Sequence, residues 1–291
     1  MPTTPTAPSI RSVGLVFNAE RSGSESFTET LSIWLRDQGL AVYTARNIAA
    51  YNPENPDPFD RLISESDLVV VLGGDGSLLG AARRAAPAGK PILGIHWGGL
   101  GFLNECQPDQ AQSAIERTLR GDYLIEERFL LLAELRRNDV CCSHCPALND
   151  VAVTRDTLSR ILSVEVSLGD EPAASFQGDG IVIATPTGST GHSLSAGGPI
   201  LDPRVDVLAV TPICPHALGG RTLVVPASER LTIRHSSPLA NVVVTLDGQV
   251  GMPMDAGDIL EVTRAPWRAR FVRFGTRRFY PVLRDKMHWR L

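Results

Sequence analysis

Residues 69–80 read VVVLGGDGSLLG, and this stretch indicates what kind of fold the chain forms. An apolar run leads directly into glycines, as a strand buried on both faces of a parallel sheet does. The small residues of 77–86 then suit a helix that begins near Ser77. At Gly73, Gly74 and Gly76 the backbone N–H groups can approach phosphate oxygens beside the positive end of that helix. The stretch therefore predicts an open α/β sheet that carries a phosphate loop.

Asp75 is the unexpected residue of this loop, because a carboxylate repels phosphate. In one interpretation it satisfies loose N–H groups at the start of the helix. In the other it is a base that orients an attacking hydroxyl, since an aspartate with a pKa of about 3.9 is ionised at pH 7. A divalent metal would then offset its repulsion of the phosphates. The loop alone leaves both interpretations open.

Two common nucleotide-binding motifs do not fit the loop. A Walker A motif requires GxxxxGK[ST], but the one Gly-Lys pair, Gly89–Lys90, is followed by Pro91. A Rossmann motif requires a third glycine where this chain has Leu79, and the expected acidic residue after the next strand is missing. The loop therefore gives little support to hydride chemistry.

The chain around the loop divides into two regions of different character. The first alternates predicted strands (13–18, 40–45, 67–74 and 91–95) with predicted helices (24–38, 77–86 and 109–120), and a proline-rich loop covers 52–58. From about residue 122 closely spaced strand patterns follow, at 123–137, 147–155, 160–168, 180–186, 205–212, 222–226, 230–235, 241–246 and 258–264. We therefore expect a tail at 1–10, an α/β domain at 11–121, a β-rich domain at 122–265 and a C-terminal tail at 266–291.

The composition excludes several classes of protein. The chain has 291 residues, enough for about two domains, and a net charge of −4, which gives no reason to expect nucleic-acid binding. Its N-terminus has no basic start and no apolar segment, and no apolar run approaches the ~18 residues of a membrane helix. Five cysteines, an odd number, argue against a disulfide framework. We expect a cytoplasmic protein that binds no membrane.

Charge is concentrated at the C-terminus. Residues 264–291 hold nine Lys and Arg and one acid, a local charge of +8 that leaves −12 on the rest of a chain whose total is −4. Such a tail usually packs back onto the acidic body, and we expect it to contact the N-terminal domain. Direct binding of an anionic ligand is the alternative.

The sequence CCSHC contains Cys141, Cys142, His144 and Cys145, which are residue types that bind metals. A structural zinc site usually takes a second pair of ligands from elsewhere, and Cys106 and Cys214 stand alone. We therefore expect free thiols in a turn or at a strand end, with a metal site as the alternative.

Residues 178–200, GDGIVIATPTGSTGHSLSAGGPI, form a second loop rich in small polar residues. GHSLS, residues 191–195, resembles the nucleophile elbow of esterases, but Ser195 replaces the final glycine that its strained turn requires. Six hydroxyls between glycines can instead bind sugar hydroxyls, amides and phosphates. They belong to Thr185, Thr187, Ser189, Thr190, Ser193 and Ser195.

These motifs together resemble the NAD kinase family. The resemblance is carried by GGDGS at 73–77, LGFL at 100–103, Asn149–Asp150 and the loop 178–200, with PICPH at 212–216 and DGQ at 247–249 in agreement. The matches run in order from about residue 13 to 280. GGDG alone also occurs in lipid kinases and 6-phosphofructokinases, whereas the Thr/Gly/Ser loop with Asn149–Asp150 is specific.

The resemblance implies phosphorylation of NAD by ATP at the 2′-hydroxyl of the adenosine ribose. It also implies a divalent metal ion, with Mg²⁺ as the first choice, that is bound mainly through the phosphates. Asp75 would be the general base, with Gly76 against the ligand and Gly73, Gly74 and Ser77 in the phosphate loop. Phe102 would pack on the nucleotide, Asn149 and Asp150 would hold its ribose or adenine, and Asp179 would bind the nicotinamide riboside across a subunit interface in a homodimer or homotetramer. The further expected contacts are Arg160, Gln177, Thr187, Thr190, Gly191, His192, Ser193, Leu194, Ser195 and Gln249.

Five residues depart from the usual family pattern. Ser77 stands where Thr is usual, His96 where Asn is usual, Gln177 where a basic residue is usual, and Gly191–His192 where Ala-Tyr is usual. They leave the preference between NAD and NADH open. Two other functions also remain as alternatives, a kinase of the related lipid or sugar-phosphate class and a non-catalytic dinucleotide-binding protein.

Overall fold

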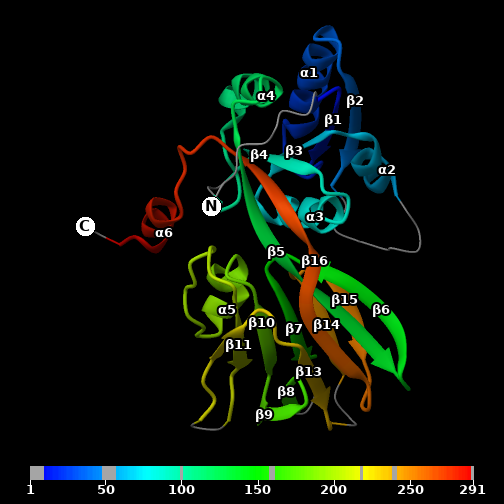
Figure 1. The fold of residues 1–291 in the computed structure, drawn as a ribbon, viewed down its shortest axis with the longest axis vertical. Helices are drawn as coiled ribbons and strands as arrows, with labels where there is room; N and C mark the ends of the chain where they lie inside the picture. Colours follow the sequence, from blue (N-terminus) through cyan, green and yellow to red (C-terminus); the bar gives the residue numbers. More distant parts are fainter. Residues whose placement is uncertain are drawn as a thin grey trace. The chain divides into compact units, whose positions relative to one another are not determined.

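The structure is a computed structural model that describes residues 10–47, 57–98, 101–156, 161–216, 219–237 and 241–289. The chain forms two compact units, one of residues 1–128 with 267–291 and one of residues 129–266 (Figure 1). All but the last residue of the predicted tail 1–10, and most of the predicted loop 52–58, lie outside the described residues.

The first unit is built on a parallel sheet in the order β2-β1-β3-β4. Its strands are β1 (Ser12–Phe17), β2 (Ala41–Arg46), β3 (Leu68–Gly73) and β4 (Pro91–His96). Every residue of β1 and β3 is buried, which confirms the predicted open parallel sheet. The end of β16 (Ile259–Arg273) pairs in parallel with β4 at Arg270 and Phe271, so the C-terminal segment packs on this unit as expected.

Helices cover both faces of this sheet. Leu31 of α1 and Ile115 of α4 join the apolar core with alternate residues of the strands. On the other face a Cβ atom at Gly14 would collide with Leu62 of α2. The helices are α1 (Ser24–Asp37), α2 (Pro58–Glu65), α3 (Asp75–Ala85), α4 (Ala111–Leu119) after the 3-10 turn η1 (Pro108–Gln110), and α6 (Phe279–Met287).

Two helix starts differ from expectation. Helix α3 begins at Asp75 rather than near Ser77, because Gly74 adopts the extended conformation of an N-cap and the helix follows it at once. Helix α2 was not predicted; it begins directly after Asp57, whose side chain forms a capping box with Asp60. No helix within the described ranges is long and apolar enough to cross a membrane.

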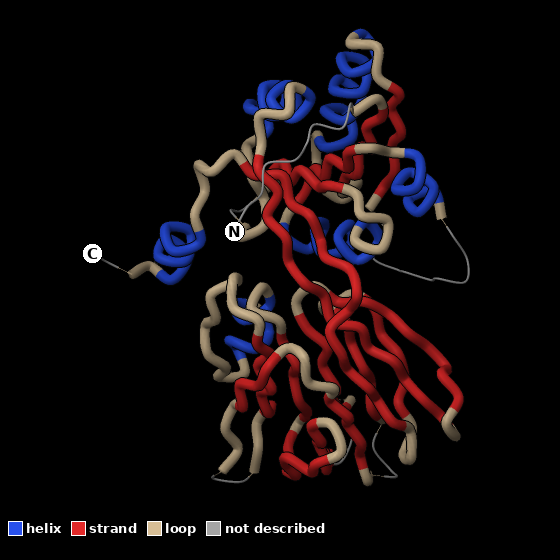
Figure 2. The backbone as a smooth tube through the Cα atoms, viewed as in Figure 1, coloured by secondary structure: helices blue, strands red, loops and turns tan. Residues whose placement is uncertain are grey.

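The second unit is rich in strands (Figure 2), which confirms the predicted β-rich region. One antiparallel sheet has the order β12-β11-β10-β7-β14-β15, and the other strands follow the order β16-β13-β8-β9, with β5 pairing β16 and β6. The first sheet contains β7 (Asp150–Arg155), β10 (Gly180–Ala184), β11 (Val207–Ile213), β12 (Leu223–Pro226), β14 (Val242–Leu246) and β15 (Val250–Met254). The remaining strands are β5 (Leu124–Arg137), β6 (Val140–Ala147), β8 (Leu162–Leu168), β9 (Glu171–Gly178) and β13 (Leu231–His235).

The CCSHC sequence, expected in a turn or at a strand end, lies within β6 and begins at the second residue of that strand. Among the described strands β6 pairs with β5 alone, and a register shift opposite Leu135 and Arg136 makes Cys142 the extra residue of a bulge. Cys141 and Cys142 are exposed, Cys145 is buried, and all three are free thiols. In the part of the chain that the structure describes, no three His, Cys, Asp or Glu side chains are grouped to hold a metal ion.

Candidate functional site

The glycine loop lies at the carboxyl end of the parallel sheet, where β3 ends at Gly73 and α3 begins at Asp75. Strands β1 and β3 are neighbours, so the loop stands where the strand order reverses, the usual ligand position in such sheets. Gly73 is packed so closely that a Cβ atom there would collide with Ser77. A Cβ atom at Gly74 would meet nothing within 4 Å, and the start of α3 has no side-chain cap. This arrangement suits the approach of a phosphate.

The carboxylate of Asp75 does not cap its own helix. Its Oδ2 accepts a hydrogen bond from the backbone N–H of Phe102 at 2.7 Å, and its Oδ1 accepts one from Leu103 at 3.1 Å. These donors fix the plane of the carboxylate. Each oxygen of an ionised carboxylate can accept more than one hydrogen bond, so Asp75 can also accept a proton from a ligand hydroxyl.

The segment that supplies these donors is anchored to the sheet. The side-chain amide of Asn104 donates to the carbonyls of Gly73 at 3.2 Å and Ile95 at 3.3 Å. The N–H of Glu105 donates to the carbonyl of Gly94 at 2.9 Å. Asp75 therefore lies against a segment that is tied to both β3 and β4.

Phe102 contacts the C-terminal helix. Its ring lies 6.0 Å from the ring of Phe279, and Nζ of Lys286 lies 4.9 Å from its centroid. The sequence had indicated a nucleotide as the neighbour of Phe102. In the described structure the ring is already partly covered by α6.

In the second unit, the Asn149–Asp150 pair is held by one carboxylate. Asp247 accepts hydrogen bonds from the backbone N–H groups of Leu148 at 3.1 Å, Asn149 at 2.7 Å and Asp150 at 3.2 Å. Asp247 is buried and has a φ of 52°, in the left-handed region that Asp adopts more readily than most residues. The DGQ motif is visible in the sequence, but this role of Asp247 was not predicted from it. The motif's match to the family pattern was the available signal.

Asn149 is half-buried and Asp150 is buried, and both side chains belong to this cluster. Oδ1 of Asn149 has no donor among the residues that the structure describes. Burial, together with the nearby charge of Asp247, raises the pKa of the Asp150 carboxyl to about 7. Gly188 lies against the backbone of Asn149, where a Cβ atom would collide with it. The pair and the start of the hydroxyl loop thus form one packed cluster.

The six hydroxyls of the second loop divide into two groups. Thr185, Ser189 and Ser193 are buried and bond within the protein, to Leu148 at 2.6 Å, Pro186 at 2.7 Å and Thr211 at 3.0 Å respectively. The second group remains accessible: Thr187 and Thr190 are half-buried and Ser195 is exposed. Short helical turns, η2 (Gly188–Thr190) and α5 (His192–Ser195), shape the loop. Gly191 and Leu194 are half-buried and His192 is exposed.

The remaining predicted contacts lie further along the second unit. Asp179 forms an ion pair with Arg155 at 2.8 Å. Gln177 is exposed on β9, and Gln249 is half-buried two residues after Asp247. Arg160 lies outside the described residues.

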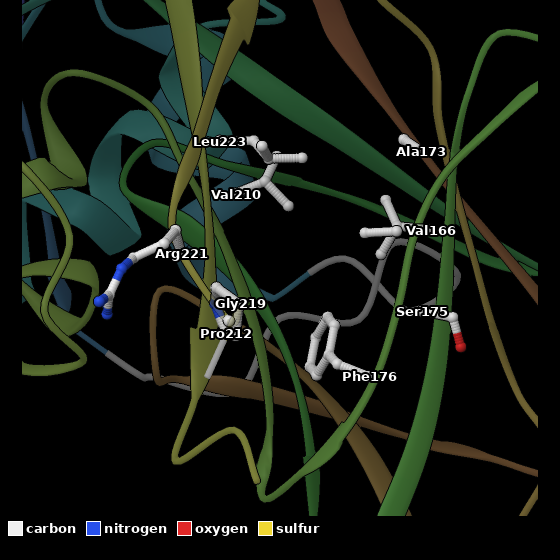
Figure 3. Close-up of a pocket in the computed structure, with 11 residues that line it drawn as sticks. Val166, Ala173, Ser175, Phe176, Val210, Pro212, Gly219, Arg221 and Leu223 are labelled. Atoms are coloured by element: carbon white, nitrogen blue, oxygen red, sulfur yellow. The ribbon is translucent and has the colours of Figure 1, made fainter. Parts of the chain in front are cut away.

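A separate cavity of about 280 Å³ opens in the second unit (Figure 3). Its lining is mostly apolar and includes Val166, Phe176, Val210 and Leu223, with Arg221 at one side. The residues that line it include none of those expected to bind NAD.

Comparison with protein families gives two matches that together span most of the chain. Residues 13–123 match the ATP-NAD kinase N-terminal domain, and residues 148–274 match the ATP-NAD kinase C-terminal domain. An NAD kinase of Heliobacterium modesticaldum is 42% identical over 94% of this chain and 98% of its own length. An NAD kinase of Symbiobacterium thermophilum is 41% identical over 94% of this chain and 97% of its own length.

Two solved structures are similar in fold. A yeast NADH kinase complexed with NADH has a TM-score of 0.86 at 22% identity, over 99% of this chain and 93% of that one. An NAD kinase from Archaeoglobus fulgidus in complex with ATP has a TM-score of 0.74 at 22% identity, over 95% of this chain and 98% of that one.

Proposed function

The chain belongs to the NAD kinase family, and from this premise we propose how its residues act on the substrate. As a member of that family it is a phosphotransferase that phosphorylates NAD with ATP. We propose that the acceptor is the 2′-hydroxyl of the adenosine ribose and that the product is NADP. The family relationship supports the reaction, and the residues below support its mechanism.

Asp75 is the general base in this proposal. The 2′-oxygen forms a bond to the γ-phosphorus of ATP, the bond between that phosphorus and the leaving oxygen of ADP breaks, and the hydroxyl proton passes to Asp75. The observation that carries the assignment is the fixed carboxylate, held by the N–H groups of Phe102 and Leu103 beside an uncapped helix start. Phosphoryl transfer depends mainly on such positioning.

The phosphates of the donor lie against the glycine loop in this proposal, at Gly73, Gly74, Gly76 and Ser77. The open space over Gly74 supports this position. A divalent cation, with Mg²⁺ the first choice, would offset the repulsion between the phosphates and Asp75 when bound. Among the residues present, the Asp75 carboxylate offers an oxygen ligand of the type that Mg²⁺ prefers.

The adenosine is bound by the second unit in this proposal. The buried Oδ1 of Asn149, which has no donor among the described residues, supports it, because a buried acceptor needs a donor and the adenine amino group or a ribose hydroxyl provides one. The same site is lined by Asp150, Thr187, Thr190, Gly191, His192, Leu194 and Ser195. Ser193 supports it through the hydrogen bond of its buried hydroxyl group to Thr211. Phe102 packs on the nucleotide, Asp179 binds the nicotinamide riboside in a homo-oligomer, and Arg160, Gln177 and Gln249 make peripheral contacts.

An assay of NADP formation from NAD, ATP and Mg²⁺ tests the proposal. Replacing Asp75 with Asn should lower kcat by about 10²–10⁴, the usual effect of losing a general base, and leave NAD binding nearly unchanged. Asp37→Asn, an exposed acid at the end of α1, is the matched control and should behave as wild type. Full turnover by Asp75→Asn would overturn the role of Asp75.

Three further properties belong to the same proposal. Activity should be lost on chelation with EDTA and return with Mg²⁺. The protein should form a homodimer or homotetramer in solution, as light scattering would measure. The free thiols agree with a reducing cytoplasm, and fractionation of the source cell would test that location.

A further inference from the structure

Two arginines of the C-terminal segment hold the support loop, residues 101–104, by its carbonyl groups. Arg273 donates to the carbonyl of Leu103 at 2.7 Å. Arg277 donates to the carbonyl of Asn104 at 2.7 Å and to that of Gly101 at 3.0 Å. Three of the four carbonyls of the support loop are therefore bound by guanidinium groups.

The same loop donates its N–H groups to Asp75. Gly101 C=O and Phe102 N–H belong to one peptide group, so this peptide accepts from Arg277 at one end and donates to Asp75 at the other. Hydrogen bonds in such a chain polarise and strengthen one another. A single peptide group thus connects the guanidinium of Arg277 to the carboxylate of Asp75.

The two arginines differ in what else they bind. Arg273 is buried and paired with Glu105 and Glu126, which explains its place in the fold. Arg277 is half-buried, and no carboxylate lies within ion-pair distance of it among the described residues. Burial and the neighbouring charge of Arg273 lower the pKa of Arg277, while the charges of Glu105 and Asp75 act in the opposite direction. Among the described residues, the hydrogen bonds of its guanidinium group go to the support loop.

We propose that Arg277 is a positioning residue for the reaction: it orients the carboxylate of Asp75 through the peptide group that joins Gly101 to Phe102. The inference rests on the proposed role of Asp75 as base. Under this proposal, Arg277 contacts neither NAD nor ATP. Its effect is to keep the two N–H donors of the support loop in the geometry that fixes the base.

The chain offers a matched control in the next residue. Arg278 is exposed, and as the N-cap residue of α6 its side chain caps no helix N–H group. Arg277→Ala should lower kcat about 10- to 100-fold, the effect expected of a misplaced catalytic group, with the KM values for NAD and ATP within about threefold. Arg278→Ala should keep wild-type kinetics. Equal kcat values for the two variants would overturn the proposal.

Conservative replacement and chemical rescue separate positioning from general destabilisation. Arg277→Lys should recover only part of the activity, because an ammonium cannot bind two carbonyls with the geometry of a planar fork. Millimolar guanidinium should raise the kcat of Arg277→Ala and leave that of Arg278→Ala unchanged. An Arg277→Ala variant that guanidinium leaves unchanged would count against the proposal.

Hydrogen exchange gives a readout that does not depend on activity. The Phe102 and Leu103 amides should exchange faster in Arg277→Ala and in Asp75→Ala than in wild type, and at the wild-type rate in Arg278→Ala. Unchanged exchange in Arg277→Ala would overturn the link through the loop. If Asp75→Asn retains full turnover while Arg277→Ala speeds exchange, the role of Asp75 fails and the structural link stands, so the two failures are distinguishable.

Discussion

Gly101 lies so close to Asp75 that a Cβ atom at position 101 would overlap the Oδ1 atom of its carboxylate. Any side chain at position 101 must therefore displace the carboxylate or the support loop. We expect Gly101→Ala to lower kcat about 10- to 100-fold while the protein stays folded, since small displacements of a catalytic group cost this much. Steady-state assays at saturating NAD and ATP measure it.

The control for that substitution is Gly251→Ala in β15. A Cβ atom there would lie 3.7 Å from Val243, an ordinary contact, so both stability and kcat should stay at the wild-type level. A Gly101→Ala enzyme as active as Gly251→Ala would show that the close approach to Asp75 has no catalytic consequence.

Asp247 should be needed both for stability and for NAD binding. Its replacement by Ala leaves three backbone N–H groups without their acceptor, at a cost of about 1–3 kcal/mol for each that stays buried. We expect a loss of at least about 3 kcal/mol in urea unfolding and a higher KM for NAD. Asp170→Ala is the control: its side chain is 96% exposed, and such a surface pair with Arg230 contributes less than about 1 kcal/mol.

Asp150 should make stability depend on pH. Its pKa rises from 3.8 to about 7 in the folded protein, so the fold binds a proton that the unfolded chain has released. This contribution to stability is fully present below pH 3.8 and is lost as the pH rises through 7. Between about pH 5.5 and about pH 8, wild type should lose on the order of 2 kcal/mol relative to Asp150→Asn.

Urea unfolding of both proteins at the two pH values measures this difference. Asp37→Asn serves as the exposed control and should follow wild type. A constant difference in stability between wild type and Asp150→Asn would contradict the assignment of the titration to Asp150.

The five thiols should fall into two classes of reactivity. Cys141, Cys142 and Cys214 are exposed and should react quickly with Ellman's reagent. Cys145 and Cys106 are buried, and burial raises the pKa of Cys106 to about 12, so little reactive thiolate forms. We expect three thiols per chain to react quickly in the folded protein and the other two to react only on unfolding. In the double variant Cys141→Ser/Cys142→Ser, one thiol should react quickly.

The sequence predicted the parts of the fold whose signals are local. The apolar run before Gly73 identified a central strand, and the helix and strand patterns around it were mostly confirmed. Strands β6, β9 and β15 were missed. Strand β9 begins with exposed residues and contains Pro172, and all three lie at sheet edges, where one side of the strand needs no apolar partner.

The candidate site was predictable in its residue types but not in its supports. A serine among glycines has the same sequence signature whether it points inward, as Ser193 does, or outward, as Ser195 does. The partners of Asp75 are backbone N–H groups of Phe102 and Leu103, which have no signature of their own. Arg277 is one of nine basic residues in its segment, and its role depends on which carbonyls it meets.

The order in which the chain is made gives a consequence of the split first unit. A ribosome synthesises the loop of Asp75 early, and then the whole second unit, before Arg273 and Arg277 emerge. Strand β4 likewise lacks its pairing partner β16 until Arg270 and Phe271 have been synthesised. A chain that ends before Arg273 would thus carry most of the proposed nucleotide contacts without the two arginines proposed to orient Asp75. Under this proposal, the base is oriented only after the segment with Arg273 and Arg277 has been synthesised.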